Sequence, residues 1–103
     1  MNKCIAERKL LYAEKGSDER KELIIRIGAP YVVDQHTVSF PVGEGISGCT
    51  VEFDGLPEIS TNETYGADSL QAIQLAVNVE PILESLNRKY DFYFLTGESY
   101  FKS

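Results

Sequence analysis

Side chains that could act as a nucleophile, a base or a metal ligand are few in this sequence and stand far apart. The chain has one histidine, His36, and two cysteines, Cys4 and Cys49. No Cys-x-x-Cys or His-x-x-x-His spacing is present, so the sequence predicts no metal site. A disulfide between the cysteines would require the first strand to lie beside the fourth. We therefore expect a protein that is not an enzyme and holds no cofactor, with His36 in a loop and both cysteines as small buried side chains.

Three glycines, at positions 43, 45 and 48, have the Gly-x-Gly-x-x-Gly spacing of dinucleotide-binding loops. In such a loop the glycines follow a strand and lead into a helix whose N-terminus binds the phosphates. Here the following residues, 49–53, alternate between apolar and polar side chains as a strand does, and Glu44 would repel a phosphate. We therefore expect residues 43–48 to form a hairpin loop and not a nucleotide site.

Carboxylates recur through the middle of the chain. Glu52 and Asp54 alternate with apolar residues, so they project from one face of a predicted strand. Such a group is typical either of an ordinary solvated face or of an anionic surface that attracts a basic partner. On the second interpretation, the residues that bind the partner are Glu44, Glu52, Asp54, Glu58 and Glu63.

Strands must position these carboxylates, because most of the chain before residue 66 has the period of two that is typical of a sheet. Residues 5–14 and 20–27 flank a turn-forming cluster and predict a hairpin. In the second of these runs, the residues expected to face the core are Leu23, Ile25 and Ile27. Further strands are predicted at residues 37–42, 48–54, 58–65 and 90–95.

The period changes to that of a helix at Asp68. Asp68, followed three residues later by Gln71, forms a capping box that predicts the start of the helix. Pro81 lacks an amide hydrogen, so we expect a kink or a break into two helices near Val79 and Glu80. The apolar face is so wide that we expect the helix to be deeply buried; its residues are Leu70, Ala72, Ile73, Leu75, Ala76, Val77, Val79, Ile82, Leu83 and Leu86.

The order of these elements predicts the fold class. All the early strands precede the helix, which argues against alternating β-α units and against a doubly wound nucleotide-binding fold. With 103 residues, 43% of them hydrophobic, the chain has the size and composition of one domain with one core. We expect a single α+β domain, residues 1–103, in which an antiparallel sheet of five to seven strands packs against one long or proline-broken helix.

The start of the helix resembles two known families. The string Gly66-Ala67-Asp68-Ser69-Leu70 resembles the Gly-x-Asp-Ser-Leu motif of acyl carrier proteins, and this resemblance implies a phosphopantetheine arm on Ser69. Carrier proteins are helical bundles, however, whereas the residues before Ser69 have the pattern of strands. With residues 71–76 added, the same string is similar to that of a small uncharacterised bacterial family with a Gly-x-Asp-Ser-Leu-Gln-Ala helix start after a run of strands. This second resemblance implies an α+β fold and no particular activity.

The charge of the chain narrows the choice of partner. Sixteen acidic and ten basic side chains give a net charge of -6 and an isoelectric point near 4.7, which disfavours nucleic acid and anionic membranes as partners. No apolar run is long enough to cross a membrane, and no export signal opens the chain, so we expect a cytoplasmic protein.

In composition the chain resembles immunity proteins, including those that act against contact-dependent growth inhibition toxins. We therefore expect a protein that binds and neutralises a basic toxin such as a nuclease. Two alternatives stay open: a carrier-like domain modified at Ser69, and a scaffold that self-associates through an exposed sheet edge or through the aromatic tail of Tyr100 and Phe101.

Overall fold

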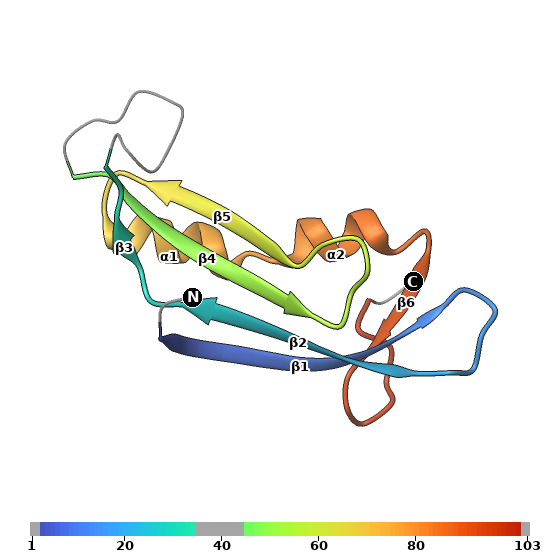
Figure 1. Cartoon of the computed structure of the whole chain (residues 1–103). Helices are drawn as coiled ribbons and strands as arrows, with labels where there is room; N and C mark the ends of the chain where they lie inside the picture. The colour runs from blue at the N-terminus through green and yellow to red at the C-terminus, as the bar shows by residue number, and fades with distance from the viewer. Residues whose placement is uncertain (1–2, 35–44, 102–103) are drawn as a thin grey trace.

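A computed structural model describes residues 3–34 and 45–101 of the chain (Figure 1). It contains a six-stranded antiparallel sheet and a bent helical segment, so the predicted α+β class is confirmed. The strands are β1 (Cys4–Glu14), β2 (Lys21–Gly28), β3 (Tyr31–Val32), β4 (Ser47–Asp54), β5 (Thr61–Gly66) and β6 (Tyr90–Tyr93), and the helices are α1 (Ser69–Val77) and α2 (Glu80–Leu86). The predicted strand at 37–42, together with His36 and Glu44, lies outside the described residues.

The sheet is built around three long strands. β1 and β2 form the predicted hairpin, β2 pairs with β4, and β5 pairs with the opposite side of β4. β3 follows Pro30 and continues along the same side of β4 as β2, with Tyr31 opposite Gly48. β6 pairs with the edge of β1 that faces away from β2. Because β2 separates β1 from β4, Cys4 and Cys49 are not on neighbouring strands, and both thiols are free. Cys49 is buried as predicted, but the prediction is wrong for Cys4, which is exposed because it begins β1.

One face of the sheet forms the core, as the alternation of the strand residues predicts. Leu23, Ile25 and Ile27 of β2 are buried, and they pack with the inward residues of β4, which are Cys49, Val51 and Phe53. The helices cover this face, with α1 against β4 and β5 (Figure 1). The alternate residues of the same strands, including Arg26, Glu52 and Asp54, project from the other face, which we call the outer face.

The capping box at the start of α1 is present. The amide of Gln71 donates to Asp68 Oδ1 at 2.8 Å, and Gln71 Oε1 accepts from the amide of Ala67 at 2.6 Å. The predicted break is confirmed as well: α1 ends at Val77, and α2 begins at Glu80 with Pro81 in its first turn. Proline is tolerated there because the first amides of a helix have no partner within the helix.

The expectation of a deeply buried helix is wrong for α1. Its inward residues, Ala72 and Ala76, are fully covered, whereas Leu70, Leu75 and Val77 are each about half exposed or more. The physical reason is that α1 packs against only two strands, so one narrow side of the helix is covered. In α2 the apolar pattern does reach the core, through Leu83.

Contact between α1 and β5 depends on Gly66. A Cβ atom at this position would lie 2.6 Å from the amide nitrogen of Ala72 and 2.8 Å from Gln71 Cβ. Thr64 Oγ1 also donates to the carbonyl oxygen of Ala72 at 2.9 Å. The chain therefore turns from strand to helix with the two backbones touching, and this fixes where α1 lies on the sheet.

Two predicted strands are shorter than expected. β5 begins at Thr61 and not at residue 58, because residues 55–60 form the turn after β4, in which the amide of Phe53 donates to the carbonyl of Ser60. β6 ends at Tyr93 and not at residue 95, because the amide of Phe94 donates to the carbonyl of Glu98 and closes a second turn.

Candidate functional site

The outer face of the sheet carries a cluster of charged side chains centred on Arg26. The register places Arg26 opposite Glu52 of β4 on one side and opposite Glu7 of β1 on the other. Arg26 Nη1 donates to Glu52 Oε1 at 2.5 Å and to Asp54 Oδ2 at 3.1 Å, and Arg26 Nε lies 3.9 Å from Glu7 Oε2. The hydrogen bonds to Glu52 and then to Asp54 raise the pKa of Arg26. One guanidinium is thus shared by three carboxylates.

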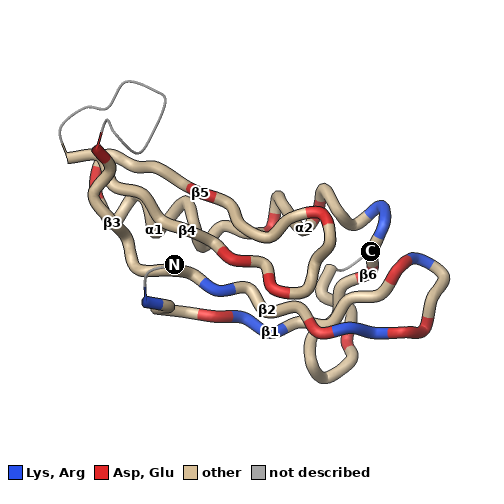
Figure 2. The backbone as a smooth tube through the Cα atoms, in the orientation of Figure 1, with Lys and Arg blue, Asp and Glu red and all other residues tan. Residues whose placement is uncertain are grey.

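These side chains remain accessible to solvent. About a third of the Glu52 side chain and 58% of the Asp54 side chain are exposed. An open hollow of about 430 Å³ adjoins them, and its lining residues are Glu52, Phe53, Asp54, Gly55, Leu56, Ser60 and Thr61. Figure 2 shows acidic segments without basic ones along β4 and β5, both acidic and basic segments along β1 and β2, and basic segments after α2. The hollow therefore combines acidic and hydroxyl-bearing residues with the apolar Phe53 and Leu56.

Glu63 belongs to the same face. It lies on β5 opposite Thr50, whose hydroxyl donates to Glu63 Oε1 at 2.9 Å, and the hydroxyl of Tyr31 also donates to Glu63. The Tyr31 ring lies over Gly48, where a Cβ atom would be 2.5 Å from the ring carbon that bears the hydroxyl. Burial, followed by the hydrogen bond to Glu63, raises the pKa of Tyr31.

Glu58 is separate from this group. It lies in the turn between β4 and β5, where Glu58 Oε2 is 2.8 Å from Lys89 Nζ and also accepts from the Tyr90 hydroxyl at 2.9 Å. The hydrogen bond from Lys89 lowers the pKa of Glu58. The structure thus brings Glu52, Asp54 and Glu63 together on the outer face and places Glu58 beside the segment that follows α2, while Glu44 lies outside the described residues.

Sequence reasoning missed Arg26, Glu7 and Tyr31 as members of this site. The period of two in β2 does place Arg26 on the face opposite Ile25 and Ile27, so its orientation was readable from the sequence. Its partners were not, because they depend on the register of β1 and β4 against β2.

The other candidate side chains do not assemble into a site. Cys49 is buried, its thiol donates to the carbonyl of Gly28 at 3.1 Å, and burial raises its pKa. Ser69 is exposed at the first position of α1, directly after the capping Asp68. Within residues 3–34 and 45–101, no three His, Cys, Asp or Glu side chains are grouped so that they could hold a metal ion.

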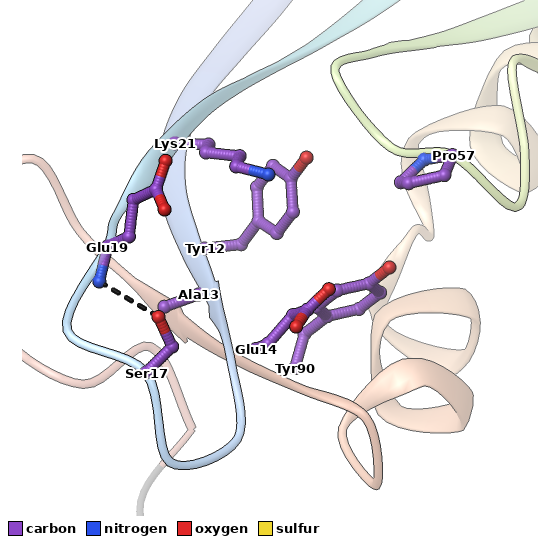
Figure 3. Close-up of a pocket in the computed structure, with 8 residues that line it drawn as sticks. All are labelled: Tyr12, Ala13, Glu14, Ser17, Glu19, Lys21, Pro57 and Tyr90. Carbon is purple, nitrogen blue, oxygen red and sulfur yellow. Dashed lines mark hydrogen bonds between the residues drawn. The ribbon is translucent and has the colours of Figure 1, made fainter.

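A second hollow lies where the β1–β2 hairpin meets Tyr90 (Figure 3). At about 100 Å³ it is smaller than the roughly 300–1,000 Å³ of most small-molecule sites. The hydroxyls at its wall already have partners: Tyr12 donates to the carbonyl of Gly55, and Ser17 Oγ accepts from the amide of Glu19. This hollow is therefore a weaker candidate than the acidic one.

Comparison of the chain with protein-family models, with curated proteins and with solved structures finds no match. Among the helices of the described residues, none is long and apolar enough to cross a membrane.

Proposed function

We propose that this protein is a non-enzymatic binding protein that docks a basic protein partner on the outer face of its sheet. The observation that carries the proposal is the convergence of Glu7, Glu52 and Asp54 on the single guanidinium of Arg26. Two negative charges of this cluster are not neutralised by Arg26. Exposed and uncompensated charge on one face accelerates association with a partner of opposite charge and selects against partners of the same charge.

The way these carboxylates are held also supports the proposal. Glu52 and Asp54 project from β4, an interior strand, which pairs with β2 on one side and β5 on the other. The backbone of paired strands is fixed before the partner arrives, so binding adds little backbone ordering cost. The hollow between Asp54 and Thr61 is open enough to admit a lysine or arginine side chain of the partner.

The biological role that we propose is that of an immunity protein, with a basic toxin domain such as a nuclease as the partner. An inhibitor of this kind needs a rigid scaffold and complementary charge and requires no catalytic groups. The carrier alternative has less support: Ser69 is exposed, but the chain around it forms an α+β sheet protein and not a helical bundle.

The experiment compares capture of partners by three forms of the tagged protein in its native host. We expect the wild-type chain to retain a basic protein that is encoded beside its own gene and is released by raised salt. The variant Glu52→Lys/Asp54→Lys should lose this protein. The control Glu84→Lys/Glu98→Lys makes the same change of net charge at exposed positions away from the outer face and should keep it.

Two results would count against the proposal. Equal retention by the two double variants would show that the acidic cluster does not form the binding surface. Absence of any stoichiometric partner of the wild-type chain would remove the binding function. A circular-dichroism melt of each variant checks that a loss of capture is not a loss of folding.

A further inference from the structure

Residues 4–10 of β1 form a free edge of the sheet within the described part of the chain. β2 pairs with β1 from Cys4 onward, but on the other side β6 pairs only with Leu11 to Glu14. In the part of the chain that the structure describes, no strand pairs with the edge of residues 4–10 that faces away from β2. Figure 1 shows this part of β1 with β2 on one side and no strand on the other. Every second residue of such an edge directs its amide and carbonyl groups toward an absent neighbour, which makes the edge a template for another strand.

An apolar groove runs beside this edge on the helix-covered side of the sheet. It has a volume of about 120 Å³ and is lined mainly by Ala6 of β1, Ile27 of β2 and Val77 and Val79 near the end of α1. Val77 is half exposed, as is Ile5 next to Ala6. A strand added at the edge would cover part of this apolar surface, which is a second reason for the edge to be occupied.

The charges along the edge determine which incoming strands can pair with it. Glu7 and Lys9 project from the outer face, and Arg8 projects from the inner one. An incoming strand must therefore offer a positive residue opposite Glu7 and a negative residue opposite Lys9, because like charges directly opposite each other are destabilising. The sequence Glu7-Arg8-Lys9 itself meets this requirement when it runs antiparallel.

We propose that a second copy of this chain occupies the edge, through antiparallel pairing of residues 6–10 of β1 across a two-fold axis at Arg8. In this register Glu7 lies opposite Lys9 of the second copy and Lys9 lies opposite its Glu7. Each register brings one pair of like charges together at its axis, Arg8 with Arg8 or Glu7 with Glu7, but only the axis at Arg8 adds two pairs of opposite charge, so the charge order selects it. Because the same residues serve both copies, the interface is closed and the association stops at a dimer.

Two local features fit this arrangement. The register of β1 against β2 shifts between Cys4 and Ala6, and such a bulge ends the regular edge just before the paired stretch. The two Arg8 side chains that meet at the axis are each held within their own copy, since Arg8 Nη1 donates to the Tyr100 hydroxyl at 2.7 Å and lies 3.4 Å from Glu80 Oε1. Glu80 thus reduces the repulsion between the two guanidinium groups.

The test is sedimentation equilibrium of the purified full chain over a range of concentrations. We expect the wild-type protein to show a reversible monomer–dimer equilibrium. Glu7→Lys and Lys9→Glu should each weaken dimerisation by about tenfold, because each changes two symmetry-related pairs from attraction to repulsion. The double variant Glu7→Lys/Lys9→Glu restores opposite charges across the axis and should return the dimer constant to within about twofold of the wild-type value.

Glu84→Lys on α2 and the double variant Glu52→Lys/Asp54→Lys serve as controls and should leave dimerisation unchanged. This second control also separates the dimer from the proposed partner surface, since it should abolish capture of the basic partner while a dimer still forms. A wild-type chain that is monomeric at every concentration overturns the inference. A dimer whose dissociation constant is unchanged by both single reversals also overturns it. The same holds if the double variant is folded, as its melting curve shows, but dimerises no more tightly than either single variant.

Discussion

The packing of the two helices leads to a sharp prediction about two leucines that the sequence pattern places in one apolar face. Leu83 of α2 is completely buried in the core, whereas 65% of Leu70 in α1 is exposed. Truncation of a fully buried leucine to alanine removes its transfer free energy and leaves a cavity, at a cost of about 2–5 kcal/mol. Taking about 3 kcal/mol, we expect Leu83→Ala to lower the melting midpoint of a domain of this size by roughly 12–24 °C.

Leu70→Ala is the matched comparison. Only about a third of this side chain is covered, so the transfer free energy lost is below about 1 kcal/mol, and the higher helix propensity of alanine offsets part of it. Urea unfolding of both variants measures the two costs, and an unchanged dependence on urea would show that the unfolded state is not altered. Equal costs for the two variants, or a cost below about 1 kcal/mol for Leu83→Ala, would refute the arrangement of the helices on the sheet.

Three further outcomes are expected. Gly66→Ala should destabilise the protein by about 1–3 kcal/mol in the same urea assay, because the added methyl group meets the backbone of the first turn of α1. Iodoacetamide near neutral pH should alkylate the exposed Cys4 and spare Cys49 in the folded protein, because Cys49 is buried and its pKa is raised. Mass spectrometry after digestion measures the labelling of each cysteine, and equal labelling would contradict the burial of Cys49. The pKa values of Tyr31 and Tyr90 are raised in the folded state, mainly by burial, so the folded state holds these protons more tightly than the unfolded one. The contribution of these two tyrosines to stability should be constant below a pH of about 10 and should fall as the pH rises above it, as measured by urea unfolding together with tyrosinate absorbance.

The local pattern of the sequence determined most of the elements. Alternation in residues 20–27 and 48–54 identified both the strands and the residues that face the core, because successive side chains of a strand point to opposite sides. Asp68 and Gln71 marked the start of α1, and Pro81 marked the break before α2, because capping and the missing proline amide act within a few residues.

Contacts between distant parts of the chain decided the rest. Whether an apolar helical residue is buried depends on how many strands lie beneath it, so the sequence could not distinguish Leu83 from Leu70. The acidic residues were visible in the sequence, but the register of three strands brings Glu7, Glu52 and Asp54 to Arg26 and sends Glu58 to Lys89. Within the described residues, the free edge of β1 likewise exists because β6 is short. Local periodicity thus determines which face a side chain occupies, whereas strand register and element length determine its neighbours.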